Sequence, residues 1–365
     1  MHIRIVGAGL LGASIGLSLG SSGHEISLHD ASPLAMSLAC GLGAGRAARS
    51  GDRPDVVVIA APPDVTAELA VQALREYPDA LVMDVASVKT RVLRELEMAM
   101  TVAEHTAAAA RFVGTHPMAG KERSGAVHAD GDLFRGRPWV LVPTADTAPE
   151  TIQVVTGLVV AMGALPITMD AGDHDDAVAA ISHLPQVMAS LVAGQLVNLD
   201  QGALALAGQG LRDTTRIAHS DPLLWSRILA ANAGPVRAHL VQISASLDEL
   251  IAALRKCEDQ PYPPAGVAGI VEAINRGGQG VARIPGKHGG AQRVYREIEV
   301  YVPDRPGQLG RLFADIGEAN VNIEDVRLEH AAAATMGVAT LSIEPGAAGH
   351  LITYLEERGW SVVGQ

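Results

Sequence analysis

Apolar and polar positions change their pattern twice along the chain. Over about the first 165 residues, short β-branched runs alternate with stretches of helical spacing such as DVTAELAVQALREY. The strand-like runs are IRIVG, EISLHD, VVVIAAP, LVMDVAS, FVGTHP, WVLVP and LPITMD. Alternation of this kind is typical of a doubly wound parallel sheet covered by helices. We therefore predict an α/β domain of Rossmann type over residues 1–170.

From Asp173 to about Lys256 no strand-like run occurs. Apolar residues there recur at i, i+3, i+4 and i+7, as in VAAISHLPQVMASLVAGQLV and VRAHLVQISASLDELIAALR. This spacing predicts amphipathic helices, and we expect an all-helical domain over residues 171–257. Residues 258–293 are rich in Gly, Pro and polar side chains, which indicates a linker with one short helix around 267–275.

The last segment of the chain combines both patterns. REIEVYV, QLGRLFADIGEA, VNIEDVRLEH, TMGVATLSIEP, GHLITYLEERG and SVVGQ follow one another, with a DRPG turn after the first. They predict the order β-α-β-β-α-β over residues 294–365. That order is typical of a ferredoxin-like α+β module.

The charge of the chain restricts its partners. There are 28 Lys and Arg against 40 Asp and Glu among 365 residues, so the formal net charge is −12. Nonspecific binding to nucleic acid or to an anionic membrane needs a basic face, and we expect neither. Anionic small molecules remain possible where a few basic residues line a cleft.

Cysteine and apolar content indicate a cytoplasmic protein. Cys40 and Cys257 lie far apart without a C-x-x-C motif, which excludes a disulfide framework and a thiolate metal site. Although there are 13 His, none shows H-E-x-x-H or comparable ligand spacing, so we expect no metal. The chain begins with a strand-like run rather than a signal peptide, and its uninterrupted apolar stretches are shorter than the roughly 18 residues of a membrane span.

A glycine-rich turn follows the first predicted strand. It has the G-x-G-x-x-G pattern and opens a helix, which is the context of a dinucleotide-binding turn. Gly7 permits the tight turn, Gly9 lets a pyrophosphate approach the backbone, and Gly12 allows close helix packing. The alternative is a glycine-rich turn without a ligand. The expected binding residues are Gly7, Gly9, Leu10, Leu11 and Gly12.

Asp30 ends the second predicted strand. A carboxylate at this place accepts hydrogen bonds from both adenosine ribose hydroxyls and repels a 2′-phosphate. No Arg follows it in ASPLAMS. We therefore expect NAD as the cofactor rather than NADP.

Three polar residues follow later strands of the predicted sheet. Ligands of an open α/β sheet bind beyond the carboxyl ends of the strands, so Ser87 and Lys89 are candidates for the nicotinamide side of the crevice. Ser87 is equally well explained as the N-cap of the helix VKTRVLREL. His116 ends the next strand, and an imidazole with an ordinary pKa near ~6.5 is suited to accept a hydroxyl proton as a hydride leaves the same carbon.

The helical segment adds groups that suit an anionic substrate. His183 and Gln186 share one helix face in ISHLPQ. Arg216, after LRDTT, can bind a carboxylate with two hydrogen bonds. Taken one by one these residues are typical of surfaces and caps, but together they supply what a dianionic substrate requires.

Five segments in order carry a family resemblance: GAGLLG, DVASVK, GTHPMAGKERSG, ISHLPQ and LRDTTRIAHSDPLLW. They resemble the prephenate and arogenate dehydrogenases of tyrosine biosynthesis over residues 1–256. The resemblance implies a Rossmann domain followed by a helical domain that forms a dimer. It also implies NAD-dependent oxidative decarboxylation of prephenate to 4-hydroxyphenylpyruvate, or of arogenate directly to tyrosine.

The same resemblance implies roles for single residues. His116 corresponds to the catalytic base that takes the ring-hydroxyl proton, and Ser87 to the serine that supports this hydroxyl and the nicotinamide. Arg216 corresponds to the arginine that binds a substrate carboxylate.

Other residues of the motifs have more general counterparts. Glu122 corresponds to an acidic residue near the entrance, and His183 to the histidine of the helical domain. Gln186 stands where some members have a second histidine, so recognition of the substrate side chain stays open.

The segment VPDRPGQLGRLFADIGEANVNIEDV resembles an ACT domain, a regulatory module that binds amino acids. The resemblance implies an effector site at Asp304, Gly307, Asn322 and Ile323, with tyrosine as the expected effector. The alternative is a module that serves only assembly. ACT domains usually pair through their sheets, so we expect a homodimer or a higher homo-oligomer.

Two other readings compete with this one. A hydroxyacid dehydrogenase or pyrroline-carboxylate reductase would share the GAGLLG turn and a helical dimer domain, but the segments HPMAGKERSG and TRIAHSDPLLW argue against both. A non-enzymatic amino-acid sensor would not need His116, Ser87 and Arg216 together.

Overall fold

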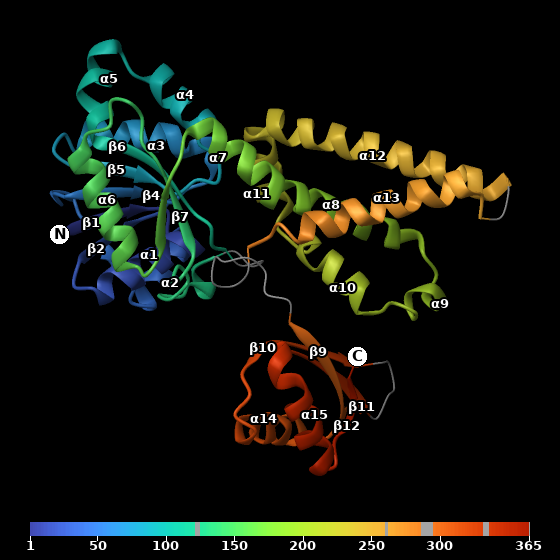
Figure 1. Cartoon of the computed structure of the whole chain (residues 1–365). Coiled ribbons are helices and arrows are strands. Elements are labelled where there is room, and N and C mark those ends of the chain that lie inside the picture. Colours follow the sequence, from blue (N-terminus) through green and yellow to red (C-terminus); the bar gives the residue numbers. More distant parts are fainter. Residues whose placement is uncertain (121–124, 260–261, 286–294, 331–335, 365) are drawn as a thin grey trace. The chain divides into compact units, whose positions relative to one another are not determined.

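The computed structural model describes residues 1–120, 125–259, 262–285, 295–330 and 336–364. The chain folds into two compact units (Figure 1). Unit 1 comprises Met1–Leu199 and Thr214–Ser244, and unit 2 comprises Asp200–Asp213 and Ala245–Gln365.

Unit 1 is built on one eight-stranded sheet with the order β3-β2-β1-β4-β5-β6-β7-β8. The neighbouring pairs from β3 to β6 are all parallel, in the order 3-2-1-4-5-6 of a doubly wound sheet. This confirms the predicted Rossmann-type domain. The strands are β1 (His2–Val6), β2 (Glu25–His29), β3 (Arg46–Ala47), β4 (Val56–Ile59), β5 (Leu81–Asp84), β6 (Phe112–Pro117), β7 (Pro138–Val142) and β8 (Leu165–Thr168).

The last two strands depart from the expected parallel sheet. Strand β7 pairs antiparallel with β6, and β8 pairs parallel with β7. A parallel neighbour needs a crossover, usually a helix. Between β6 and β7 the described residues contain only the short 3-10 turn η2 (Ala126–His128), so the chain returns antiparallel. Helix α6 (Pro149–Ala161) provides the crossover from β7 to β8.

Helices cover both faces of this sheet (Figure 1). The buried apolar residues form one cluster with α1, α2 and α6 and a second with α3, α4 and α5. All four residues of β4 are buried, as expected for a central strand between two helical layers. The covering helices, besides α6, are α1 (Leu10–Ser21), α2 (Pro33–Gly41), α3 (Pro63–Glu76), α4 (Thr90–Ala99) and α5 (Val102–Ala108), followed by η1 (Ala109–Arg111).

The remainder of unit 1 is helical, as predicted. Its elements are α7 (Ala171–Val178), the π-helical turn η3 (Ala179–His183), α8 (Leu184–Gln195), η4 (Leu196–Asn198), η5 (Arg216–Ala218), α11 (Pro222–Ala231) and the first part of α12 (Ala233–Asp259). Helix α11 lies against α3 of the sheet domain, and α7 lies against α4.

The continuous helical run Ala171–Asn198 is long and apolar enough, at a mean hydropathy of 1.4, to cross a membrane. Length and composition alone also fit a core helix of a soluble protein. This run buries His174, Asp175 and His183, and each of them has a polar partner within unit 1. These buried polar contacts assign one face of the run to the packing of unit 1, although only 28% of its most apolar window is buried.

Unit 2 begins with helices and corrects the expected linker. Helix α13 extends from Pro264 to Val281 and is much longer than the short helix expected within residues 258–293. A Cβ on Gly269 would lie 2.9 Å from Cβ of Ala253 on α12, so this glycine permits a close helix crossing. This glycine of α13 therefore has a packing role, contrary to the linker expected from the composition. The short helices are α9 (Gln201–Leu204) and α10 (Gln209–Thr215), whose last two residues belong to unit 1.

The C-terminal part of unit 2 has the predicted β-α-β-β-α-β succession. Its four strands form an antiparallel sheet with the order β10-β11-β9-β12. Both helices share one apolar core with the sheet. The elements are β9 (Arg296–Pro303), α14 (Gln308–Glu318), β10 (Ile323–His330), β11 (Met336–Ile343), η6 (Pro345–Ala347), α15 (Ala348–Glu357) and β12 (Ser361–Gly364).

Candidate active site

The glycine-rich turn forms a cradle at the carboxyl end of β1. Gly7 has φ +108°, and a Cβ there would lie 2.2 Å from the carbonyl oxygen of Ala60. A Cβ on Gly12 would lie 1.9 Å from the carbonyl oxygen of Gly7, whereas one on Gly9 would meet nothing within 4 Å. Gly7 and Gly12 are thus required by packing, and Gly9 borders open space at the start of α1. This arrangement fits a dinucleotide pyrophosphate.

Two leucines complete the first turn of α1. Leu10 and Leu11 are both partly buried, and Leu11 packs against the core beneath the turn. Their backbone belongs to the helix N-terminus, where the N–H groups point toward a bound anion.

Asp30 stands beside this turn. Its Oδ2 accepts a hydrogen bond of 2.7 Å from the backbone N–H of Ala8, and its Oδ1 accepts one of 2.7 Å from Ser32. The carboxylate is partly exposed. A negative charge is therefore fixed next to the glycine turn, at the place predicted from the sequence.

Lys89 does not face the crevice, contrary to the expectation. Its side chain is fully buried, and Nζ donates to Asp84 Oδ1 and, at 2.6 Å, to the carbonyl oxygen of Thr115. Asp84 is also fully buried, and its Oδ2 has no hydrogen-bond partner among the described groups. Burial is the largest influence on both groups: it raises the pKa of Asp84 and lowers that of Lys89.

His116, near the carboxyl end of β6, begins a chain of side chains. Its Nδ1 lies 2.9 Å from Nε2 of His174 on α7, and Nδ1 of His174 lies 2.8 Å from Oδ1 of Asp175. His174 is 0% exposed and Asp175 is 4% exposed, whereas His116 is partly exposed. Asp175 in turn accepts the backbone N–H groups of Lys89 (2.8 Å) and Thr90 (2.9 Å).

Asp175 therefore caps helix α4 from another element. Lys89 is the N-cap residue of α4 and provides no side-chain cap, so Ser87 is not the N-cap, contrary to the alternative considered for it. Ser87 is partly buried in the segment between β5 and α4. Sequence reasoning missed both His174 and Asp175.

His183 belongs to the same cluster. Its Nδ1 lies 3.1 Å from Nδ2 of Asn232, which also donates at 2.8 Å to the carbonyl oxygen of Asp175. The ring of His183 packs edge-on against Trp225, with centroids 6.0 Å apart. The π-helical turn η3 places His183 at this position, and such turns are frequent at functional sites.

Both imidazoles that were predicted from the sequence are uncharged at neutral pH. Burial, followed by electrostatic interactions with His174, Lys89 and His183, holds the pKa of His116 well below 6.5, and Asp175 opposes this only in part. Burial also lowers the pKa of His183 to about 4. His116 thus has an unprotonated ring nitrogen available to accept a proton.

The structure shows less of the surroundings of the three remaining predicted residues. Gln186 is buried, and its Oε1 accepts a hydrogen bond of 3.4 Å from Ser220. Arg216 is exposed on η5, which packs against α8. Glu122 lies outside the described residues.

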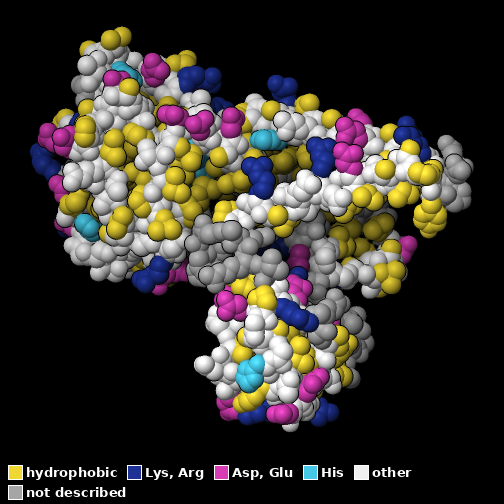
Figure 2. Space-filling model, in the orientation of Figure 1, with side chains coloured by type: hydrophobic (Ala, Val, Ile, Leu, Met, Phe, Trp, Pro, Cys, Tyr) yellow, Lys and Arg dark blue, Asp and Glu magenta, His cyan; other side chains and the backbone are white. Residues whose placement is uncertain are grey.

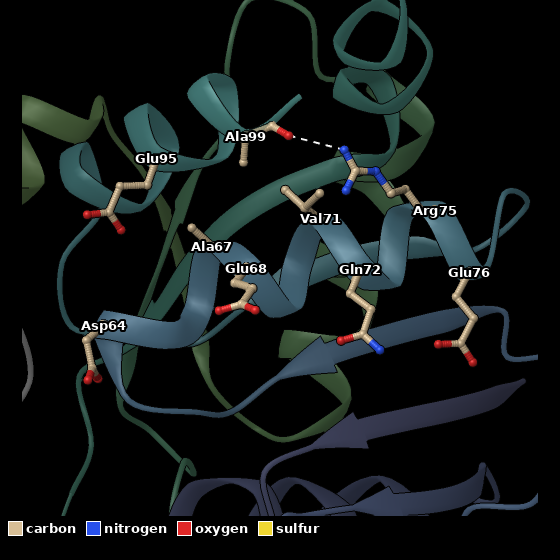
Figure 3. A pocket seen from close by; sticks show the side chains of 9 residues that line it. All are labelled: Asp64, Ala67, Glu68, Val71, Gln72, Arg75, Glu76, Glu95 and Ala99. Atoms are coloured by element: carbon tan, nitrogen blue, oxygen red, sulfur yellow. Dashed lines mark hydrogen bonds between the residues drawn. The ribbon is translucent and has the colours of Figure 1, made fainter. Parts of the chain in front are cut away.

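A groove of about 640 Å³ lies elsewhere in unit 1, along α3 and the facing end of α4 (Figure 3). Its polar lining is mainly acidic, and Arg75 is engaged there by the carbonyl oxygen of Ala99 and by Glu104. The groove contains no imidazole and no part of the glycine turn. We do not assign the chemistry to it. Its charged lining residues are Asp64, Glu68, Arg75, Glu76 and Glu95.

Comparisons with known proteins agree with this geometry. The family model described as the prephenate dehydrogenase nucleotide-binding domain matches residues 15–167, and the prephenate dehydrogenase dimerization domain matches residues 170–262. The chain is 35% identical, over 98% of both chains, to NovF of Streptomyces niveus, which is described as a probable prephenate dehydrogenase. It is 27% identical to the prephenate dehydrogenase of Lactococcus lactis over 90% of both chains.

Solved structures give the same result. Prephenate dehydrogenase from A. aeolicus, in complex with hydroxyphenyl propionate and NAD⁺, is 26% identical with a TM-score of 0.66, covering 77% of this chain and 98% of that one. Arogenate dehydrogenase from Synechocystis is 26% identical with a TM-score of 0.60, covering 77% and 100%. The chain belongs to the prephenate dehydrogenase family.

Proposed function

We propose that this protein is an NAD-dependent dehydrogenase that converts prephenate to 4-hydroxyphenylpyruvate, CO₂ and NADH. One observation carries the proposal beyond family membership. An uncharged imidazole, His116, stands at the carboxyl end of β6 in the sheet whose β1 ends in the dinucleotide cradle. Ligands of doubly wound sheets bind along this edge.

The cofactor is held by the cradle. We propose that Gly7, Gly9 and Gly12, together with the N-terminus of α1, bind the pyrophosphate, and that Asp30 binds the adenosine ribose. When bound, NAD supplies the acceptor for a hydride. Proton transfer and substrate positioning depend on the side chains of the protein.

In the proposed reaction, His116 takes the proton of the ring hydroxyl while the hydride leaves the same carbon. Loss of the ring carboxylate as CO₂ then makes the ring aromatic, and the imidazolium returns its proton to the phenolate oxygen. Aromatisation makes the step strongly downhill, so positioning and a matched base account for the catalysis.

Other residues position the substrate in this proposal. Ser87 supports the ring hydroxyl and the nicotinamide, and Arg216 pairs with a substrate carboxylate. His183 faces the substrate from the helical domain, and Glu122, outside the described residues, is assigned the role of the acidic entrance residue of the family. Family membership supports these roles.

The activity is tested by mixing the purified protein with NAD⁺ and prephenate and recording NADH absorbance. We expect NADH formation together with 4-hydroxyphenylpyruvate. Arogenate differs from prephenate only by an amino group in place of the keto group, so kcat/KM is measured for both. A larger kcat/KM with arogenate would replace the proposed substrate, and no NADH from either would reject the dehydrogenase.

Asp30 leads us to expect a preference for NAD⁺ over NADP⁺ of about 10²-fold or more in kcat/KM, because like charges placed together cost several kcal/mol. The Asp30→Asn variant should lose most of this preference. Asp79→Asn, which removes an exposed carboxylate at the opposite end of the sheet, is the control. Equal efficiency of the unmodified enzyme with both cofactors would contradict the role of Asp30.

We further propose a cytoplasmic homodimer or higher homo-oligomer. The matched dimerization domain supports it, as do the exposed apolar side chains of α12 and α13 (Figure 2). Exposed apolar side chains that gather on one surface are typical of protein interfaces. The exposed residues include Leu247, Ile251, Leu254, Val271 and Ile274.

We also propose that residues 294–365 form an ACT domain that binds an amino acid, with tyrosine as the effector. A hollow of about 350 Å³ lies at the turn between β9 and α14, lined by Asp304 and Gly307 among others. Gly307 has φ +86°, which opens the turn at the N-terminus of α14. Asn322 and Ile323 lie at the start of β10.

Tyrosine should inhibit the full chain, and a chain ending at Gln292 should be active but insensitive. Coupling of this kind is reciprocal, so substrate should weaken tyrosine binding by the same factor. Inhibition curves and calorimetric titrations of both chains test this. Equal sensitivity of the shortened chain would show competition at the active site, and no response of either chain would leave the module an assembly role.

A further inference from the structure

The His174–Asp175 pair behind His116 has no role in the reaction as described so far. Both side chains are buried, and they form a single line of polar contacts from β6 to the N-terminus of α4. A buried imidazole with a polar partner on each ring nitrogen has a defined protonation pattern. The protonation pattern of the whole line follows from the protonation state of the residue at its end, Asp175.

Asp175 is held as a hydrogen-bond acceptor. Its two carboxylate oxygens accept the N–H groups of Lys89 and Thr90, and Oδ1 also contacts Nδ1 of His174. Burial alone would raise the pKa of Asp175, but the hydrogen bonds from His174, Lys89 and Thr90 outweigh it and lower the pKa. The carboxylate is therefore ionised and can only accept hydrogen bonds.

The tautomer of His174 follows from Asp175, and the tautomer of His116 follows from His174. Because Asp175 accepts, Nδ1 of His174 carries a hydrogen, and with one hydrogen on this ring its Nε2 is an acceptor. Nδ1 of His116, 2.9 Å away, must then be the donor. Its Nε2 consequently keeps the lone pair that can take a proton.

We propose that His174, held by Asp175, is a positioning residue that keeps His116 in the tautomer with an unprotonated Nε2. This role deepens the proposed function and rests on it. When His116 takes the substrate proton at Nε2, its Nδ1–H still donates to His174. The Asp175 carboxylate, one ring away, then stabilises the positive charge.

Other titratable groups face His116 from the neighbouring elements. Lys89 lies beneath it, and His183 lies on η3. Asp84 pairs with Lys89. None of these groups contacts Nδ1 of His116 in the described structure, so the tautomer depends on His174.

Two variants of one residue separate positioning from packing. In His174→Gln the amide reaches the place of Nε2 and its oxygen can accept from His116, whereas in His174→Asn the shorter amide reaches only Asp175. Both are polar and smaller than His. We expect kcat within about 10-fold of the original for Gln and a loss of about 10–10³-fold for Asn, because a wrong tautomer alone has large effects on catalysis.

The second readout is the ¹⁵N NMR spectrum of the imidazoles without cofactor or substrate. His116 should be protonated at Nδ1 in the original enzyme and in His174→Gln, and should populate the Nε2–H form in His174→Asn. His350→Phe, an exposed histidine of α15, is the control. If His174→Asn leaves both the tautomer and kcat unchanged, or if Gln and Asn are equally impaired with the same tautomer, the positioning role is wrong. If the original enzyme does not oxidise prephenate, the proposed function fails while the spectrum still tests His174.

Discussion

Replacing His116 with Asn should lower turnover by about 10²–10⁴-fold and leave NAD⁺ affinity nearly unchanged. The substitution removes the base at the end of β6 without touching the cradle of Gly7, Gly9 and Gly12 at the end of β1. Asn can still donate to His174, so the fold of the cluster is preserved. Stopped-flow or steady-state kcat and a calorimetric Kd for NAD⁺ measure the two effects separately.

The pH profile adds a second check on the same residue. The proton-accepting form of His116 exists above its pKa, which burial holds well below 6.5. Activity should therefore stay level from neutral pH downward and fall only when the pH passes below that lowered pKa. His105→Asn on α5 serves as the matched control. Near-normal turnover of His116→Asn, or a fall in activity already near pH 7, would remove His116 from the mechanism.

The parts of the fold that depend on short-range patterns were predictable. The glycine turn and Asp30 were found because each follows a β-branched run and uses a residue type that the local backbone or ligand requires. The direction of β7 was not predictable, because it depends on how the chain returns after β6 rather than on the sequence of the strand itself. The run EDQPYPPAG indicated a linker, although its Gly266 packs closely against α12.

In the candidate site, too, some residues were predictable from short-range patterns and others were not. His116 was found from its place at a strand end, whereas His174 and Asp175 stand in GDHDDAV, which has the composition of an exposed acidic turn. Their burial depends on the packing of α7 against the start of α4, far away in the sequence. Lys89 was placed in the crevice because sequence alone does not show which way a side chain turns after a strand.

Lys89→Met should destabilise unit 1 by about 3–5 kcal/mol, because it leaves the Asp84 carboxylate buried without its cation. The pair is 0% exposed, and Lys89 also satisfies the carbonyl oxygen of Thr115, the residue before His116. A methionine fills similar volume but cannot donate a hydrogen bond. The loss should appear as a lower urea midpoint, with the unfolding followed by tryptophan fluorescence.

Two further variants decide whether the unpaired charge causes the loss. Lys256→Met, at an exposed position of α12, should change stability by less than about 0.5 kcal/mol. The double variant Lys89→Met with Asp84→Asn should recover part of the lost stability, because it removes the buried charge as well as its partner. If Lys89→Met costs no more than Lys256→Met, the two groups are neutral in the folded protein and no buried ion pair lies beneath His116.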